Sequence, residues 1–115
     1  MPIRERGWVK VGQASEIAPG RPKAVDLEGA RVALFKVPGE ESGPTQGIYC
    51  IEDLCTHDDG PVAEGPQEGD VVECPRHGAR FNIKTGEALC MPAVTGVRTF
   101  PVRIVGGEIQ IEVKE

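Results

Sequence analysis

Apolar and polar residues alternate along several short stretches of the chain, with the period of two that β-strands show. Residues 99–104 and 108–113 each place apolar side chains at every second position. Gly106 and Gly107 lie between these stretches, and two glycines readily supply the positive φ angles of a tight turn. The C-terminal part of the chain is therefore predicted to form a β-hairpin with one buried and one solvent-facing side.

Further strands are predicted in the first half of the chain. Residues 23–27 and 31–37 form a second predicted hairpin across residues 28–30, and a polar loop at 38–46 leads to a strand at 48–51. No long stretch keeps a helical apolar period, and residues 15–18 allow one helical turn at most. Several short antiparallel strands with almost no helix predict an all-β fold, an antiparallel β-sandwich or barrel.

Residues 53–92 have a different character from the predicted strands. The stretch is rich in the glycines and prolines that mark turns, and it holds both histidines and three of the four cysteines of the chain. A chain of 115 residues is the size of one domain of typical length. We therefore expect a single domain, residues 1–115, in which a loop-rich subdomain at about 53–92 is inserted in the β core and carries the function.

Composition narrows the classes of partner and the cellular compartment. A net charge of −5 argues against a nucleic acid or an anionic membrane as partner. The apolar runs, such as Val32 to Phe35, are far shorter than the roughly 20 residues of a membrane-spanning helix. The first residues show no apolar export signal, so the expected compartment is the cytoplasm, where cysteines bind metals more often than they form disulfides.

Two pairs of residues indicate the chemistry. Cys55 and His57 are separated by one residue, and Cys74 and His77, which follow after 16 further residues, by two. Core cysteines with unrelated surface histidines are one interpretation, but it leaves unexplained why both histidines lie within three residues of a cysteine. Structural zinc is a second, although its paired ligands are usually separated by two to four residues. The third is a [2Fe–2S] centre in which two histidines replace two cysteines on one iron.

This double Cys/His motif resembles the Rieske signature. The likeness continues through residues 78–82, 85–87 and 90–93, and it is similar to bacterial Rieske-type ferredoxins and to the small Rieske subunits of nitrite reductases. The resemblance implies a Rieske-like fold with one [2Fe–2S] cluster. By the same resemblance, Cys55 and Cys74 bind the inner iron, and His57 and His77 bind the outer iron.

The resemblance also has departures, which imply a low reduction potential. High-potential members carry an extra cysteine in each cluster loop, where this chain has Gly60 and Arg76, so their disulfide cannot form. Hydroxyl donors of those members correspond to Ala79 and Phe81. Fewer hydrogen bonds to cluster sulfur make reduction less favourable.

Other residues of the resemblance carry smaller expectations. Gly78 is expected to leave space and free backbone N–H groups beside the cluster, and Pro92 to lie in a third loop that covers it. Cys50 alternates with apolar neighbours and is expected to be a buried core thiol, with a Cys50–Cys90 disulfide as the less favoured alternative.

The resemblance implies a function in electron transfer. The leading hypothesis is a one-electron carrier, monomeric in isolation, between a flavoprotein reductase and a terminal oxygenase. The chain is not expected to be an enzyme, because no residue resembles a substrate-handling acid, base or nucleophile. The alternatives are a relay subunit of a nitrite reductase or similar enzyme, and a zinc-stabilised interaction module. The segment between His57 and Cys74 has six acidic and no basic residues, which predicts a surface that steers a basic partner.

Overall fold

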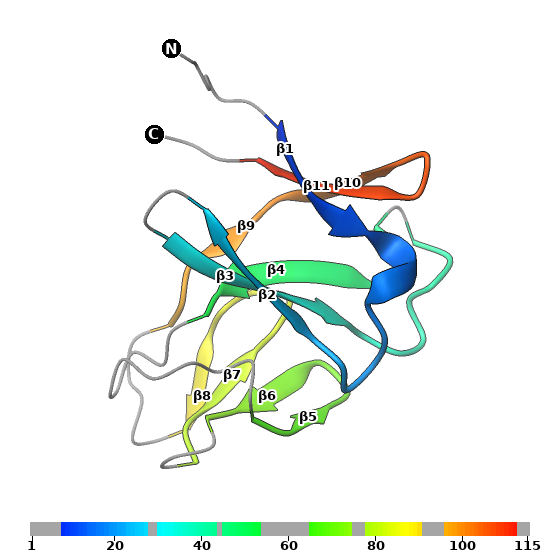
Figure 1. Cartoon of the computed structure of the whole chain (residues 1–115). Coiled ribbons are helices and arrows are strands. Elements are labelled where there is room, and N and C mark those ends of the chain that lie inside the picture. The colour runs from blue at the N-terminus through cyan, green and yellow to red at the C-terminus, as the bar shows by residue number, and fades with distance from the viewer. Residues whose placement is uncertain are drawn as a thin grey trace.

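The described residues form three antiparallel β-sheets. The computed structural model describes residues 8–27, 30–43, 45–53, 65–74, 78–90 and 96–112. In these residues the elements are β1 Trp8–Gln13, the 3₁₀ helix η1 Ala14–Glu16, β2 Lys23–Leu27, β3 Ala30–Lys36, β4 Ile48–Glu52, β5 Gln67–Glu68, β6 Val71–Glu73, β7 Arg80–Asn82, β8 Ala88–Cys90, β9 Thr99–Phe100, β10 Val102–Val105 and β11 Glu108–Glu112. The strand orders are β1-β11-β10, β2-β3-β4-β9 and β5-β6-β7-β8 (Figure 1). The prediction of an all-β antiparallel fold is confirmed.

In the residues that the structure describes, no helix has the length and apolar character needed to cross a membrane.

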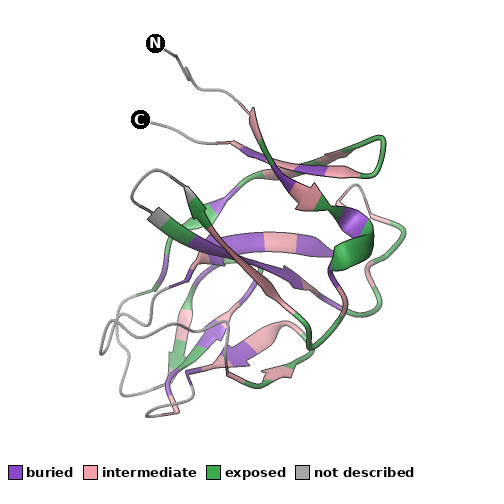
Figure 2. Ribbon diagram, in the orientation of Figure 1, coloured by how far each residue is buried: buried purple, intermediate pink, exposed green. Residues whose placement is uncertain are grey.

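The sheet β2-β3-β4-β9 is the middle layer of the molecule. On β3, Val32 and Leu34 contribute to the core shared with the sheet β1-β11-β10, whereas Ala33 and Phe35 contribute to the core shared with β5-β6-β7-β8. All four are fully buried. This explains why the run lacks the polar alternation of the other strands, since a strand covered on both faces needs apolar residues at every position. Figure 2 shows the buried positions concentrated in this layer.

Both predicted hairpins are present. β10 and β11 pair across Gly106 and Gly107, whose φ angles are 59° and 81°. β2 and β3 pair from Lys23 opposite Leu34 to Leu27 opposite Ala30. Ala30 therefore belongs to the strand, whereas the sequence pattern places it in the turn.

The stretch predicted as one strand at residues 99–104 is divided in two. Phe100 pairs with Cys50 of the middle sheet, whereas Val102 pairs with Ile111 of the three-stranded sheet. Pro101 lies between them and has no N–H with which to continue either ladder. One extended segment thus passes from one sheet to the next at this proline.

Two regions of sheet are absent from the sequence-based prediction. The stretch 53–92 is expected to be built of loops, but residues 67–90 contribute the small sheet β5-β6-β7-β8. Its strands have only two or three residues each, too few for an alternation to be recognised. The alternation in β1 is also hidden, because its register shifts between Lys10 and Gly12.

Polar side chains tie the small sheet to the middle sheet. Glu40 accepts hydrogen bonds from the Tyr49 hydroxyl (2.5 Å) and from Lys84 Nζ (2.6 Å), and Lys84 follows the small-sheet strand β7. The hydrogen bond from Lys84 lowers the pKa of Glu40, and the hydrogen bond to Glu40 raises the pKa of Tyr49. Gln67 of β5 donates to the Lys36 carbonyl of β3 at 2.7 Å. These contacts fix the small sheet relative to the core.

Gly86 closes the turn between β7 and β8 and holds the segment that returns to the middle sheet. Its φ is 78°, its N–H donates to the Asn82 carbonyl, and its own carbonyl accepts from the Val97 N–H at 2.8 Å. A Cβ on this residue would overlap the Val97 carbonyl oxygen. Both the backbone conformation and the close approach of Val97 therefore require glycine.

Substitution of Gly86 by alanine is expected to destabilise the protein more than the same change at Gly20. Gly20 has the same φ of 78°, but a Cβ added there would have no atom within 4 Å. Alanine at position 20 carries only the cost of a left-handed residue, about 1–2 kcal/mol. Alanine at position 86 adds the overlap with Val97, a further ~1–3 kcal/mol. Urea unfolding followed by circular dichroism, at matched iron content, measures both variants. Equal losses of unfolding free energy would show that the Val97 segment shifts freely.

Candidate metal centre

The small sheet brings two strand ends to one edge. β6, β7 and β8 are successive antiparallel strands, so β6 and β8 run in the same direction. Glu73, the last residue of β6, pairs with Arg80, which pairs with Cys90 at the end of β8. The carboxyl ends of β6 and β8 and the start of β7 therefore share one edge of the sheet (Figure 1). Cys74 lies directly at this edge.

Backbone hydrogen bonds close the chain around Cys74. The Cys74 N–H donates to the Ala79 carbonyl at 2.6 Å, and the Gly78 N–H donates to the Cys74 carbonyl at 3.1 Å. Of the backbone N–H groups expected to be free beside the cluster, that of Gly78 is therefore not free. Its φ of 79° is the feature that favours glycine there, because an added Cβ would make only an ordinary contact, 3.5 Å from Glu73 Oε2.

The Cys74 side chain lies in an apolar environment. It is a free thiol, fully buried, in one core cluster with Ala79, Phe81 and Ile83. Cysteine sulfur is the usual protein ligand of iron in iron–sulfur clusters. The donor chemistry of Cys74 thus fits an iron–sulfur centre.

Ala79 and Phe81 have the character expected from the sequence. Both are fully buried in the same core cluster as Cys74, and neither carries a hydroxyl group. Within the part of the chain that the structure describes, this side of the candidate centre is apolar. An apolar environment disfavours the additional negative charge that reduction brings.

The remaining predicted ligands, Cys55, His57 and His77, lie outside the described residues. Gly60, Arg76 and Pro92, to which the sequence assigned loop roles, also lie outside them.

The chain that leads to Cys55 starts from a well-held residue. Asp53 is buried, its Oδ2 lies 2.8 Å from Arg31 Nε, and its N–H donates to the Arg31 carbonyl at 2.8 Å. Side chain and backbone thus both join the end of β4 to β3. No pattern in the sequence indicates this pair, because the two residues are 22 positions apart.

In the described part of residues 58–73, one acidic residue is paired with a cation and another accepts a hydrogen bond from an uncharged amide. Asp70 accepts a hydrogen bond from Asn82 Nδ2 at 3.3 Å, and Glu73 forms an ion pair of 3.5 Å with Arg80. Glu68 is exposed. Arg80 lies outside the acidic segment in sequence but lies against it in the fold, so the described part of this surface is less negative than its sequence.

Cys50 belongs to a different part of the molecule. It is a buried free thiol in the core opposite the small sheet, as the sequence predicted, and it forms no disulfide with Cys90. Burial raises the pKa of its thiol to about 12, so it is unreactive at neutral pH.

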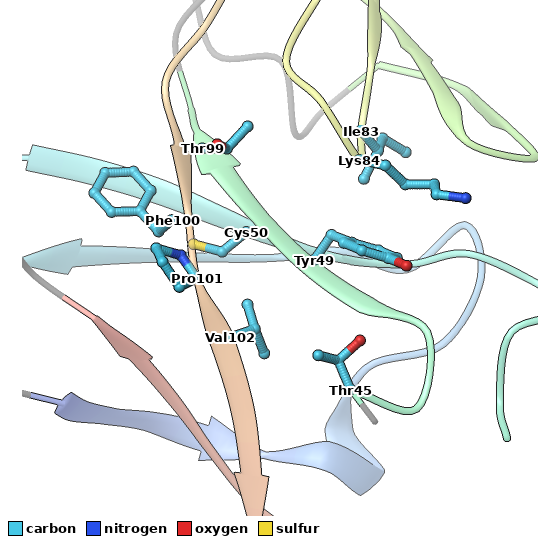
Figure 3. Close-up of a pocket in the computed structure, with 9 residues that line it drawn as sticks. All are labelled: Thr45, Tyr49, Cys50, Ile83, Lys84, Thr99, Phe100, Pro101 and Val102. Carbon is cyan, nitrogen blue, oxygen red and sulfur yellow. The ribbon is translucent and has the colours of Figure 1, made fainter. Parts of the chain in front are cut away.

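A shallow groove of about 260 Å³ passes close to Cys50 (Figure 3). Its lining includes Tyr49, Thr99 and Val102 together with Ile83 and Lys84. Ile83 and Lys84 follow β7, whereas Cys74 lies near the start of that strand. The groove is therefore at the opposite end of β7 from the candidate metal centre.

Comparison with known proteins identifies relatives of this chain. The chain is 36% identical over 105 residues to the ferredoxin component of the naphthalene 1,2-dioxygenase system of Pseudomonas putida, covering 91% of this chain and 94% of the relative. Its fold matches the ferredoxin of Sphingomonas yanoikuyae B1 with a TM-score of 0.83 and 31% identity, covering 94% and 100% of the two chains. Such relatives confirm the prediction of an electron-transfer protein rather than an enzyme.

Two further solved structures bear on the alternatives. A chain from the complex of reduced oxygenase and oxidized ferredoxin in carbazole 1,9a-dioxygenase is 35% identical with a TM-score of 0.79, covering 90% of this chain and 99% of that one. A structure described as an NADH-dependent nitrite reductase small subunit from Mycobacterium tuberculosis has a TM-score of 0.80 at 21% identity, covering 97% and 99%. The second likeness shows a shared fold alone, so the nitrite reductase alternative has the weaker support.

The family model described as the Rieske [2Fe-2S] domain matches residues 7–101. This span includes both Cys/His pairs, the small sheet and the middle sheet. It confirms the predicted cofactor, one Rieske-type [2Fe–2S] cluster, over structural zinc. On this match, and on a buried free cysteine at the edge where the motif places a ligand, the chain belongs to the Rieske [2Fe–2S] domain family.

Proposed function

We propose that this protein carries single electrons from a flavoprotein reductase to the terminal oxygenase of a ring-hydroxylating dioxygenase system. The observation that carries the proposal is its similarity to the naphthalene dioxygenase ferredoxin component over 94% of that relative. The similarity extends across all three sheets rather than the cluster motif alone. The carbazole complex, in which oxygenase and ferredoxin occur together, supports an oxygenase as the acceptor.

Four residues are proposed to hold the cluster: Cys55, His57, Cys74 and His77. They lie in a proposed cluster-binding subdomain at about 53–92 within a single domain of residues 1–115. The position of Cys74, buried at the sheet edge with its backbone tied to Ala79, supports its share of this assignment. When bound, such a cluster accepts and releases one electron, and its histidine ligands raise the reduction potential above that of all-cysteine clusters.

The chain's own residues would set the conditions for electron transfer. Ala79 and Phe81 exclude water from one side of Cys74 and offer no hydroxyl donor to sulfur. The hydrogen bonds of Cys74 with Ala79 and Gly78 hold the backbone around Cys74 in place. A rigid, dry surrounding keeps reorganisation small when the charge changes.

We further propose that the protein works as a monomer in the cytoplasm. Cys50 forms no disulfide, which is consistent with a reducing compartment. A net charge of −5 favours solubility and disfavours self-association.

The ligand assignment predicts different outcomes at two buried cysteines. Cys74→Ala should remove the visible absorbance of the cluster and most of the iron, which is expected at about two atoms per chain in the wild type. Cys50→Ala changes the same residue type in the opposite core and should retain the iron. Iron analysis and absorbance of both purified variants provide the measurement. Full iron content in Cys74→Ala, or stoichiometric zinc in wild-type protein made with ample iron, would contradict the assignment.

The reduction potential is expected near the low end of the Rieske range of about −150 to +300 mV. Ala79→Ser and Phe81→Tyr should each raise it, because a new hydroxyl near cluster sulfur stabilises the reduced state. Ala14→Ser adds the same hydroxyl to the other core and should leave it unchanged. Protein-film voltammetry compares the variants. A wild-type potential well above zero would be inconsistent with this explanation.

Electron transfer to an oxygenase tests the function itself. Chemically reduced protein is mixed with the oxidised oxygenase components of the Pseudomonas putida naphthalene system and of the carbazole 1,9a-dioxygenase system. At least one should be reduced in a second-order reaction, because this chain is 36% and 35% identical, over the aligned residues, to a relative from each system. Stopped-flow absorbance follows the transfer. If reduced, iron-replete protein passes electrons to neither oxygenase, the proposed function is rejected.

A further inference from the structure

Leu89 is an exposed apolar residue in a place that calls for an explanation. Among the residues that the structure describes, Leu89 and Val105 are the large apolar residues with substantial exposure, 43% and 51%. A single exposed leucine is ordinary on a protein surface. Two features of its position, its place in the ladder and its place relative to Cys74, distinguish Leu89 from Val105.

The first feature is a β-bulge. Phe81 of β7 pairs with Ala88, but the neighbouring Arg80 pairs with Cys90, so Leu89 is the extra residue on β8. A bulge leaves its extra residue without a partner across the ladder and re-aims its side chain, and such bulges are frequent beside functional sites. β8 is also the last strand of its sheet, so no described strand lies on its other side. Leu89 therefore has no partner residue on β7, and no described strand lies beside it on the other side of β8.

The second feature is the position of Leu89 at the same end of the small sheet as Cys74. Leu89 is the next-to-last residue of β8, whose end shares an edge of the small sheet with Cys74. Val105 ends β10 in the three-stranded sheet, on the other side of the middle layer (Figure 1). A protein that approaches the Cys74 edge meets Leu89 and not Val105.

Among the described residues, two opposite charges at this edge are paired with each other. The ion pair between Arg80 and Glu73 joins the first residue of β7 to the last residue of β6. Opposite charges that already neutralise each other contribute little to a partner's approach. Burial of an apolar side chain, in contrast, stabilises a complex without regard to ionic strength.

We propose that Leu89 is an apolar anchor that inserts into an apolar depression on the terminal oxygenase when the two proteins exchange an electron. The occupant is the oxygenase because electron transfer requires the acceptor to approach the cluster, and Leu89 lies at the same end of the small sheet as Cys74, the proposed ligand that the structure describes. One apolar anchor strengthens the encounter and still permits rapid release, as a carrier requires. This inference rests on the proposed function.

The test compares Leu89→Ser with Val105→Ser, which removes an apolar side chain of similar exposure far from Cys74. The acceptor is whichever of the naphthalene and carbazole oxygenases is reduced by the wild type. Leu89→Ser should lower the second-order rate constant about tenfold, a loss typical of a central contact residue. Val105→Ser should leave it unchanged, and Leu89→Met should restore most of the wild-type rate.

Two sets of control measurements distinguish the loss of an apolar contact from a change in charge or damage to the cluster. The wild type and Leu89→Ser should show the same dependence of the rate on salt, because the lost contact carries no charge. Their reduction potentials, iron contents and unfolding midpoints should coincide. The oxygenase should also bind the oxidised Leu89→Ser protein more weakly in isothermal titration calorimetry, a readout that does not depend on electron transfer.

Several outcomes would reject the proposal that Leu89 contacts the oxygenase while leaving the proposed function intact. An unchanged rate and affinity in Leu89→Ser would do so, as would equal losses in Val105→Ser. Loss of iron in Leu89→Ser would assign the residue a structural role. A wild-type dimer that Leu89→Ser dissociates in sedimentation equilibrium would identify a second copy of this chain as the occupant. Failure of the wild type to reduce either oxygenase would instead reject the proposed function.

Discussion

The fold depends on a middle sheet that must be covered on both faces. Val32, Ala33, Leu34 and Phe35 follow one another on β3 and are all fully buried, so neither face of the strand can meet water. One face is covered by β1-β11-β10 and the other by the small sheet β5-β6-β7-β8. The small sheet is therefore positioned by apolar burial against β3, and the candidate metal centre at its edge is positioned with it.

This arrangement explains how strands of two or three residues can hold Cys74, a proposed metal ligand, in place. Short strands have few ladder hydrogen bonds and would not be stable alone. Phe81 and Ile83 supply the apolar contact with the middle sheet, and Glu40 and Gln67 supply polar ties at other points. Cys74 is thus attached to the most deeply buried part of the molecule, which suits a centre whose charge changes during function.

The outer surface near this centre combines paired charges with an exposed apolar residue. Glu73 and Arg80 neutralise each other, and Asp70 is bonded to Asn82. Leu89 precedes Cys90, which pairs with Arg80, and the bulge in β8 leaves Leu89 exposed. The acidic segment would act at a distance through its remaining charge, whereas an apolar contact acts only after the proteins meet. The two kinds of interaction can therefore serve successive stages of one encounter.

The sequence by itself determined the chemistry and the hairpins. Two Cys/His pairs indicated a Rieske-type [2Fe–2S] cluster through residue type and spacing, and Gly106 with Gly107 defined a turn through local backbone conformation. The tertiary structure alone decided which strands share a sheet, where Pro101 divides an extended segment, and that Arg31 meets Asp53. The reason is that alternation reports burial only in strands long enough to show a period, while pairing between distant segments depends on the packing of the whole chain.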